Sequence, residues 1–274
     1  RGVVLSGGVF GTIPLLLKSR DVHRTLPDIS AELGRQIRTN SETLIVNTCR
    51  FPDGEGMPQE ICEGPSITSM FDPDDETRIE IVRFPRYGDA NFALQSAAPL
   101  TDARAGVPRS VSMLINMLRQ PIRTLRMLNP VGKSRKSIFF LVMQTRDTFV
   151  HVRSRRPWYS LFRPGWTVYQ EDTDRKLTNY FPVAHKAARE YVEVAGGGDA
   201  GNVATEVLTG APSTAHLMGG VAIGTGPENG VVDETGQVFG YHNLRVIDGS
   251  LIPGNLGVNP SLTILALSEY AWSK

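Results

Sequence analysis

The chain has 274 residues, of which 41% are hydrophobic, 21% charged and 8% aromatic. A chain of this length and composition buries a sizeable core without disulfides or metals. Its 29 basic and 28 acidic side chains leave a formal net charge of +1, which excludes a globally basic nucleic-acid coat and a disordered polyelectrolyte. The two cysteines, Cys49 and Cys62, exclude a disulfide-rich scaffold and a four-cysteine zinc site. One disulfide and two free thiols both stay open, with free thiols favoured.

The chain holds no apolar run of the ~18 residues that a membrane-spanning helix needs. It begins at Arg1 and enters a strand-like run, Val3–Leu5, almost at once. We therefore expect it to be the inner part of a longer protein, with any targeting signal outside these residues. A cytoplasmic location or one at the periphery of a membrane is the expectation.

The opening segment is typical of a strand, a glycine turn and a helix. Val3–Leu5 is the expected strand, the glycines at 7, 8 and 11 allow a tight turn, and a helix is expected to begin over 13–17. Residues 31–40 favour a second helix. Residues 50–65 are rich in glycine and proline and are expected to form a loop.

From Ser66 onward, apolar residues alternate in short runs that favour strands. These runs include Ile67, residues 79–82 and residues 138–143, and residues 151–152 extend the pattern. Alternation predicts an antiparallel sheet rather than another parallel βαβ unit. Later segments predict a helix over 181–195 and a final helix that begins at Pro260.

Residues 100–136 interrupt the predicted sheet with a basic, helix-like stretch. Asp102 is their only acid, and their eight basic residues are Arg104, Arg109, Arg119, Arg123, Arg126, Lys133, Arg135 and Lys136. Apolar residues recur among them at helical spacing, as in Met113, Met117 and Leu125. Such a stretch can lie on an anionic membrane surface. The favoured alternative is a helix that packs on its own domain with its basic face in solvent.

Gly196, Gly198 and Gly201 satisfy the spacing of a dinucleotide-binding loop. That loop must follow a strand, open a helix and precede an acid by about 20 residues. Here a helix-like run comes first and the acid is missing. A helix that ends in glycine explains this segment better.

The most informative residues lie at the two ends of the chain. His216 is followed by Gly219 and Gly220, then come Asp248-Gly249-Ser250 and finally the GVNPSLTI block over 257–264. In this order, and with the opening VVLSGGVFGT block, they resemble the glucose–methanol–choline (GMC) family of FAD-dependent oxidoreductases. The middle pieces GPSITSMFD, IEIVRFP and SIFFLVMQT are similar to the sterol-oxidising branch of that family. Leu217 and Val221 depart from it, since proline and cysteine are frequent there.

The resemblance implies a fold that combines α/β and α+β architecture. A Rossmann-like FAD-binding domain would be built from residues 1–30 and 209–274. A substrate domain with an antiparallel sheet would occupy 31–208, including the basic helical insertion near 100–136. The family's GxGxxG loop, which holds the ADP part of FAD, is not in this chain, so the chain is expected to be inactive by itself.

The residues of the GVNPSLTI block are typical of the start of a helix, and this supports its assignment to the flavin site. Asparagine is a strong N-cap and proline suits the first helical position. A helix start also attracts negative charge, such as that of a reduced flavin. Asp248 can accept hydrogen bonds from a sugar-like hydroxyl chain, and Gly249 lets the backbone approach a phosphate. By resemblance, the cofactor contacts are Gly8, Gly220, Asp248, Gly249, Asn259, Pro260 and Ser261.

His216, Asn259 and Glu80 are the candidate catalytic residues. An imidazole titrates near neutral pH, so His216 could take the hydroxyl proton of an alcohol or hold that hydroxyl. By resemblance, Asn259 binds the same hydroxyl. Glu80 alternates with Ile79 and Ile81, and its face of the strand meets either a cavity or solvent; the resemblance implies that it acts as a base. The other four histidines are expected to be structural or at the surface.

Two functions follow, and they belong to different classes. The first is FAD-dependent oxidation of the CH–OH group of a bulky alcohol, above all a sterol 3-hydroxyl, with oxygen or another electron acceptor reoxidising the flavin. The second is a truncated, non-catalytic protein that binds a sterol or a membrane. Neither function calls for a metal or a nucleic acid, and contact with the periphery of a membrane fits both.

Overall fold

The computed structural model describes residues 2–50, 60–95, 97–156, 161, 164–171 and 176–273. Residues 51–59 of the predicted loop lie outside the described residues. The chain divides into two compact units. The terminal unit comprises Arg1–Ser41, Thr145–Lys176 and Thr214–Lys274, and the middle unit comprises Glu42–Gln144 and Leu177–Ser213.

A six-stranded sheet forms the centre of the middle unit. Its order is β4 (Ile67–Phe71), β5 (Thr77–Val82), β7 (Ser137–Gln144), β3 (Thr43–Cys49), β10 (Gly198–Val203) and β6 (Ala97–Pro99). Every neighbouring pair is antiparallel. The antiparallel sheet expected from the alternating runs is therefore confirmed.

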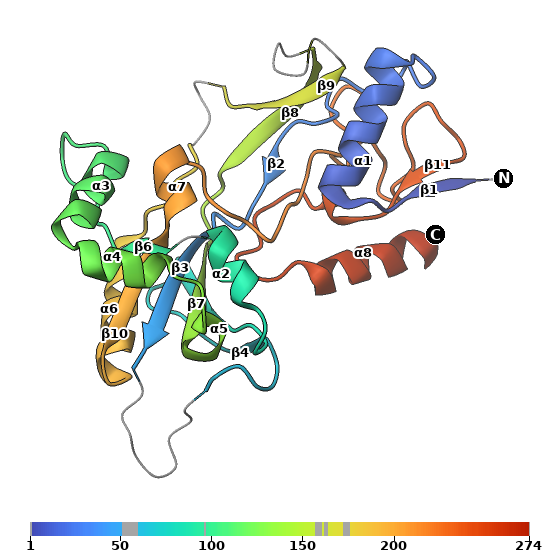
Figure 1. The fold of residues 1–274 in the computed structure, drawn as a ribbon. Coiled ribbons are helices and arrows are strands. Elements are labelled where there is room, and N and C mark those ends of the chain that lie inside the picture. The colour runs from blue at the N-terminus through green and yellow to red at the C-terminus, as the bar shows by residue number, and fades with distance from the viewer. Residues whose placement is uncertain are drawn as a thin grey trace. The chain divides into compact units, whose positions relative to one another are not determined.

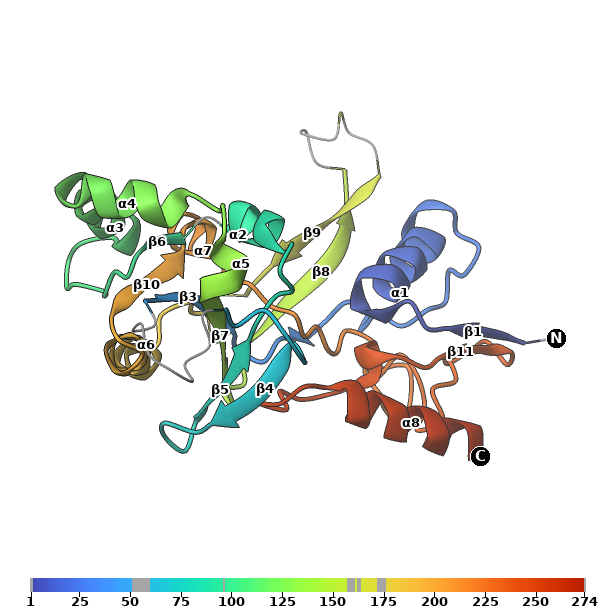
Figure 2. The same ribbon diagram turned by 60° about the horizontal axis from the view of Figure 1, so that its bottom comes forward.

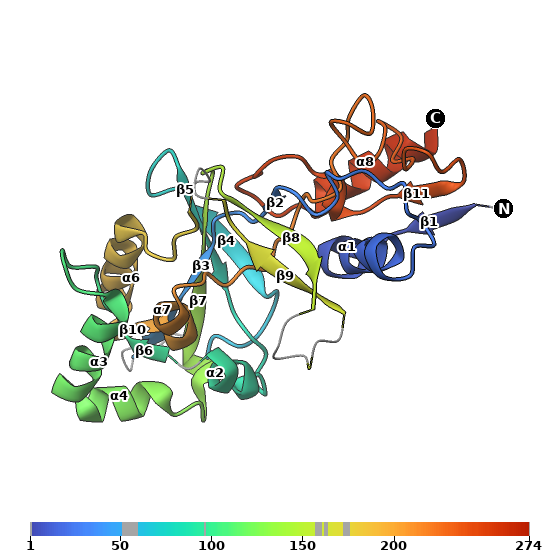
Figure 3. The same cartoon turned by 90° about the horizontal axis from the view of Figure 1, so that it is seen from above.

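Strand β7 shows why this sheet forms: all of its residues are buried. Phe140 contributes to an apolar cluster with Ile45 on one face of the sheet, and Phe139 to a cluster with Val46 on the other. Successive side chains of a strand point to opposite faces, so a continuous apolar run requires both faces to be covered. Helix α6 (Pro182–Val194) covers one face, while α2 (Asp89–Gln95) and the helices after β6 cover the other (Figure 3).

The basic stretch after β6 folds as three helices: α3 (Arg109–Arg119), α4 (Pro121–Leu128) and α5 (Lys133–Lys136). Gln120 leaves the helical region with φ −128° and ψ 58°, because the proline that follows it disfavours the helical conformation. Helices α3 and α4 lie side by side as a hairpin (Figure 2). Helix α7 (Ala204–Thr209) packs against α3.

The glycine-rich segment after α6 is a helix end, as predicted. The amide N–H of Gly197 donates to the carbonyl of Val192 (2.9 Å), which closes the last turn. Gly198 then begins β10, and a side chain at Gly198 would collide with the Thr48 carbonyl. Gly201 lies inside the same strand, so this segment does not open a helix and lacks the geometry of a dinucleotide loop.

The terminal unit joins distant segments of the chain. Strand β1 (Val3–Leu5) pairs in parallel with β11 (Leu244–Val246). Helix α1 (Gly8–Leu17) follows β1 and continues into a π-helical turn, η1 (Lys18–Val22). A three-stranded antiparallel sheet contains β2 (Ile37–Arg38), β8 (Phe149–Arg155) and β9 (Gly165–Tyr169). The unit also contains a 3₁₀ turn, η3 (Gly249–Leu251), and α8 (Ser261–Ser273) (Figure 1).

Two expectations for the terminal unit need correction. Residues 31–40 do not form a helix, because Gly34 and Gln36 have positive φ. Residues 151–152 do form a strand, but it belongs to the three-stranded sheet instead of the large one. Helix α8 lies at the surface of its unit, and Ala271 is its only buried residue.

The observed units divide the chain at different positions from the expected domains. The expected boundaries fall after residues 30 and 208, whereas the units change at Ser41 and Ser213. The segment Thr145–Lys176 also groups with the chain ends, because β8 pairs with β2.

Both cysteines are buried free thiols, so the free-thiol alternative is confirmed. Burial raises the pKa of Cys49. Burial and the neighbouring Cys49 likewise raise the pKa of Tyr191 to about 12. Among the described residues, no helix is long and apolar enough to cross a membrane.

Candidate functional site

Asp248 joins two segments that are 240 residues apart. One carboxylate oxygen accepts hydrogen bonds from the Gly8 amide (2.9 Å) and the Thr12 hydroxyl (2.6 Å). The other accepts from the amide (2.8 Å) and the hydroxyl (2.5 Å) of Ser250. Asp248 is only 7% exposed. Its carboxylate therefore fixes the start of α1 against η3, a role that the sequence did not indicate.

The segment that carries His216 is hydrogen-bonded to two other segments, one at Arg38 and one at Gly249. Met218 and Arg38 exchange backbone hydrogen bonds of 2.9 and 2.7 Å. The Gly219 amide donates to the Gly249 carbonyl (3.1 Å). Two of the blocks that resemble the GMC family are thus adjacent in the fold, although about 30 residues of chain separate them.

Asn40 connects His216 with the GVNPS block. Its amide nitrogen donates to the Val258 carbonyl (2.8 Å) and lies 3.2 Å from Nδ1 of His216. A carbonyl can only accept, so the Val258 contact fixes which end of the amide faces the ring. The second N–H of that nitrogen then donates to Nδ1 of His216. A neutral His216 therefore carries its proton on Nε2.

Asn259 follows Val258 and precedes helix α8. Helix α8 begins at Ser261, one residue after the predicted start at Pro260. In its first turn the Ile264 amide donates to the Pro260 carbonyl (2.9 Å). Helix α8 has no acidic residue in its first turn. Its N-terminal amides and partial positive charge suit an anionic group.

The glycines named as cofactor contacts fall into two groups. A Cβ added at Gly8 would meet nothing within 4 Å. The first turn of α1 has no acid of its own, but the Asp248 carboxylate accepts from the Gly8 amide. By contrast, a Cβ at Gly220 would collide with Ile13, and one at Gly249 would lie 3.2 Å from Ile264. Close packing alone explains glycine at 220 and 249, whereas Gly8 leaves room beside a helix start.

Glu80 lies in β5 of the middle unit, apart from the other candidates along the chain. It is 4% exposed, and its neighbour Ile79 is fully buried. Its strand therefore faces protein on both sides, and the solvent alternative for Glu80 is wrong. The remaining predicted site residues all belong to the terminal unit.

A second polar cluster, centred on His185, lies in the middle unit. Nδ1 of His185 is 2.8 Å from Asp102, and Nε2 faces the nitrogens of Asn202 (3.1 Å) and Arg109 (3.3 Å). Because both of those nitrogens are donors, Nε2 accepts and Nδ1–H donates to Asp102. Burial lowers the pKa of His185 to about 4. This neutral, fully bonded histidine is structural, as the sequence predicted.

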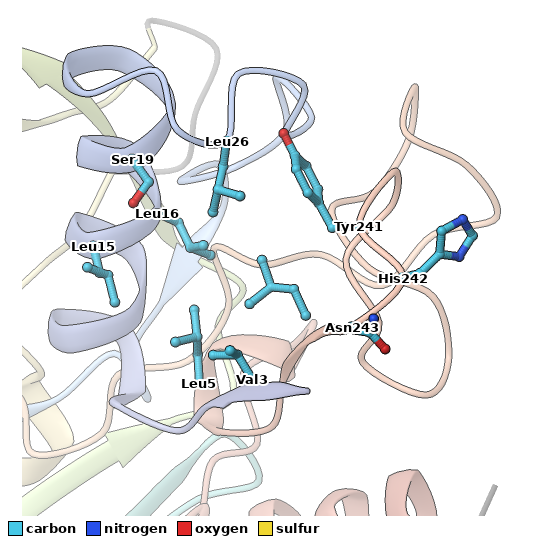
Figure 4. A pocket seen from close by; sticks show the side chains of 10 residues that line it. Val3, Leu5, Leu15, Leu16, Ser19, Leu26, Tyr241, His242 and Asn243 are labelled. Carbon is cyan, nitrogen blue, oxygen red and sulfur yellow. The ribbon is translucent and has the colours of Figure 1, made fainter. Parts of the chain in front are cut away.

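Two further observations bear on ligands. In the part of the chain that the structure describes, no three His, Cys, Asp or Glu side chains gather as a metal site would need. An apolar hollow of about 420 Å³ opens between β1, α1 and the loop at Tyr241 (Figure 4). None of its lining residues is a predicted site residue, so the hollow is not the predicted catalytic centre.

Comparison with known proteins agrees with the site. Residues 144–268 match the family model of the GMC oxidoreductases. They form the C-terminal domain of a GMC oxidoreductase. The cofactor of GMC enzymes is FAD, and the acid-free start of α8 fits one of its anionic groups. Gly8 leaves space beside the start of α1, although its amide is already bonded to the Asp248 carboxylate.

Several relatives match the whole chain. A cholesterol oxidase of Acinetobacter baumannii is 38% identical over 273 residues, which is 100% of this chain and 47% of the relative. A cholesterol oxidase of Mycobacterium tuberculosis is 36% identical over 280 residues, which is 99% of this chain and 46% of the relative. The chain therefore spans about half the length of these curated relatives.

Solved structures agree on the fold. Pyridoxine 4-oxidase from Mesorbium loti aligns with a TM-score of 0.52 at 18% identity, covering 99% of this chain and 51% of that one. An FAD-dependent oxidoreductase from Chaetomium thermophilum aligns with a TM-score of 0.50 at 15% identity, covering 100% and 54%. At these identities the likeness concerns architecture alone: the α/β and α+β fold class inferred from the sequence is that of GMC enzymes.

Proposed function

We propose that this chain is part of an FAD-dependent oxidase or dehydrogenase that acts on the CH–OH group of a bulky alcohol, above all a sterol 3-hydroxyl. The observation that carries the proposal is the site around Asn40, where the His216 and GVNPS segments meet. Support for the substrate class comes from relatives of 36–38% identity named cholesterol oxidase. Oxygen or another acceptor would take the electrons from the flavin.

In this proposal, some residues of the terminal unit would bind FAD and others would hold the binding segments in place. FAD, when bound, supplies the hydride acceptor. The start of α8 at Asn259, Pro260 and Ser261 would hold an anionic part of it, and Gly8 would leave room for the cofactor beside α1. Asp248 would act by holding α1 and η3 together, since its oxygens already accept hydrogen bonds from the protein. Gly220 and Gly249 would allow the close packing behind them.

His216 would hold the alcohol rather than deprotonate it. With Nδ1 engaged by Asn40, the neutral ring offers an N–H at Nε2. That group can donate to the alcohol oxygen and stabilise negative charge that develops there. The side chain of Asn259 would bind the same hydroxyl. The base must then be another group, and Glu80 is the candidate that the family resemblance supplies.

The rest of the protein would complete the terminal unit. A parallel sheet of two strands is too small to be stable alone, and Val3 and Val4 of β1 are 56% and 40% exposed. The apolar hollow beside β1 and Leu262 of α8 are also exposed in the described part of the chain. We propose that the half present only in the longer relatives covers these surfaces, and that this chain by itself does not turn over.

Anaerobic absorption spectroscopy of the complete protein tests the activity. Oxidised flavin bands that bleach on addition of cholesterol would support a sterol-oxidising enzyme. Bands that persist would reject cholesterol and direct the search to other bulky alcohols. A complete, folded protein without flavin bands would overturn the proposal and favour the non-catalytic alternative.

Variants of His216 test its role. His216→Ala should retain flavin and lose turnover. His216→Gln keeps an N–H donor but offers no base in the neutral pH range, so it should recover much of the activity if His216 holds the hydroxyl. Equal loss in both variants would instead assign proton abstraction to His216. Normal turnover in His216→Ala and in Asn259→Ala would remove both residues from the site.

A further inference from the structure

The hairpin of α3 and α4 exposes large aliphatic side chains on both helices. On α3 they are spaced as one helical stripe, and on α4 the pattern continues. The exposed residues are Val111, Leu114, Ile115, Leu118, Ile122 and Leu125. Leu118 and Ile122 stand on either side of the turn at Gln120 and are 81% and 80% exposed. The described residues of the chain leave this surface uncovered.

The hairpin is nevertheless firmly seated on the middle unit by its opposite face. Met113 of α3 and Met127 of α4 are buried in two apolar clusters beside β6. Arg123 and Arg126 share the buried carboxylate of Asp199, at 2.8 and 2.9 Å. The hairpin therefore packs on its own unit, as the favoured alternative expected. Unlike that expectation, Arg123 and Arg126 contact Asp199 and the aliphatic stripe faces outward.

The charge around the exposed stripe is positive. Asp102 is the only acid over 100–136, and it is engaged by His185 and Arg189. Arg119 is exposed at the turn between the two stripes, and Arg104 is exposed in the loop before α3. Two arginines also share the single charge of Asp199. An aliphatic surface with exposed arginines beside it complements an anionic surface.

We propose that the α3–α4 hairpin binds the surface of an anionic lipid bilayer. Helices of 11 and 8 residues are too short to cross a membrane, but an amphipathic helix with aliphatic and basic residues lies flat in the interface. A second copy of the chain would bring like charges together. Residues 100–136 also lack tryptophan, tyrosine and phenylalanine, the residues that anchor protein partners. The inference does not rest on the proposed catalytic function.

Vesicle flotation of the complete protein tests the proposal. The probes are vesicles of phosphatidylcholine with phosphatidylglycerol and vesicles of phosphatidylcholine alone. We expect binding to the anionic vesicles that weakens as salt is raised, because screening reduces the attraction of Arg119 and Arg104 to the headgroups. Failure to bind anionic vesicles at low salt would overturn the proposal, whatever the enzymatic activity.

The double variant Leu118→Ser, Ile122→Ser should weaken partitioning at least about tenfold, since it removes two aliphatic side chains from the interface. Leu94→Ser, Val194→Ser is the matched control, because Leu94 and Val194 are 79% and 89% exposed on other helices of the same unit. The control should bind like the wild type. Equal loss in both variants, or in neither, would assign vesicle binding to another surface.

Two other occupants of the hairpin give distinct results. If a second copy covers it, the wild type is a dimer, the double variant is a monomer, and neither protein binds the vesicles. If the rest of the protein covers it, the double variant lowers the stability of the complete protein and vesicles again retain neither. If the double variant does not fold, Leu118→Trp is used in its place. The fluorescence of the added tryptophan should shift to shorter wavelength when anionic vesicles are present. Fluorescence that does not shift contradicts the proposal.

Discussion

Both units of this chain have an apolar core, and they differ in their sheets and in the contacts that join the segments near the candidate site. In the middle unit, a six-stranded sheet buries aromatic and aliphatic side chains on both faces. In the terminal unit, the largest sheet has three strands, and the segments near His216 are joined by polar groups, above all Asp248 and Asn40. An apolar core tolerates small changes by repacking, whereas a buried polar joint fails when a single partner is removed.

This difference agrees with the division of labour in the proposed function. A cofactor site needs backbone groups held at fixed positions, and short hydrogen bonds from a buried carboxylate provide that. A substrate domain needs a stable framework that carries variable helices, which the large sheet provides. Four predictions test the comparison, in order of decreasing expected effect, and each uses the complete protein.

The largest effect is expected from Phe140→Ala in the middle unit. Phe140 is fully buried in β7 and packs edge-on against Phe71 and Tyr191. Its removal leaves a cavity and should lower the free energy of unfolding by about 4 kcal/mol, as measured by urea denaturation. Phe71→Ala is the control: Phe71 is 39% exposed and should cost about 1 kcal/mol. Equal losses would mean that the core is not centred on β7.

The second prediction concerns pH and the His185 cluster. Asp102, Arg109, Arg189 and Asn202 face this histidine, yet burial dominates and lowers its pKa from 6.5 to about 4. Between these values the unfolded chain takes up a proton that the folded chain refuses. The contribution of neutral His185 to the free energy of unfolding is therefore complete above pH 6.5. It is lost as the pH falls toward 4, by roughly 3 kcal/mol in all.

Urea denaturation at several pH values measures this loss. Carboxylates such as Asp102 titrate in the same range, so the test is the difference between the wild type and His185→Gln, which has no titrating ring. The variant should be less stable at pH 7, and the gap should close as the pH falls from 6.5 to 4. A gap that is constant with pH would show that folding does not change the pKa of His185, and this would overturn the burial argument.

The third prediction probes the polar joint at Asp248. Asp248→Ala leaves two amides and two hydroxyls without their acceptor, and at least the Gly8 and Ser250 amides cannot turn elsewhere. We expect a loss of about 2–3 kcal/mol in unfolding free energy together with weaker retention of FAD. Asp233→Ala is the control, because Asp233 bonds only to its own turn, at Thr235 and Gln237. FAD retained as in the wild type would separate this joint from the cofactor site.

The sequence predicted the local features of both units well. The strand at Val3–Leu5, the glycine end of α6 and the start of α8 all depend on signals within a few residues. Glycine and proline fix the backbone where they stand, and a buried strand is apolar along its length. The family blocks then supplied the candidate site residues, of which His216 and Asn259 lie in segments that Asn40 connects.

Features that depend on distant contacts escaped the sequence analysis. Asn40 lies 176 residues before His216, and no pattern around it signals a role. Strand β8 was assigned to the wrong sheet, since alternation predicts a strand but not its partner. The outward stripe on α3 and α4 was missed because periodicity locates an apolar face without showing what covers it.

The smallest effect is expected at Asn40, which we infer to be a positioning residue. Asn40→Ala removes the donor to His216 Nδ1 and to the Val258 carbonyl. The ring is then free to rotate and to take the other tautomer, so fewer molecules present the Nε2 donor in the position that the alcohol requires. We expect flavin to be retained and kcat to fall about tenfold, which corresponds to ~1.4 kcal/mol, with KM little changed.

Asn40→Asp distinguishes positioning from a merely structural role. A carboxylate at this place accepts from Nδ1–H, so it favours the tautomer with a bare Nε2 and raises the pKa of the imidazolium. Only the protonated ring then offers an N–H at Nε2, so the kcat of Asn40→Asp should fall as the pH rises and the ring loses that proton, whereas Asn40→Ala should show no such fall. If both variants lose activity in parallel with their stability, and neither moves the profile, then Asn40 only holds the chain together and the donor role of His216 loses its basis.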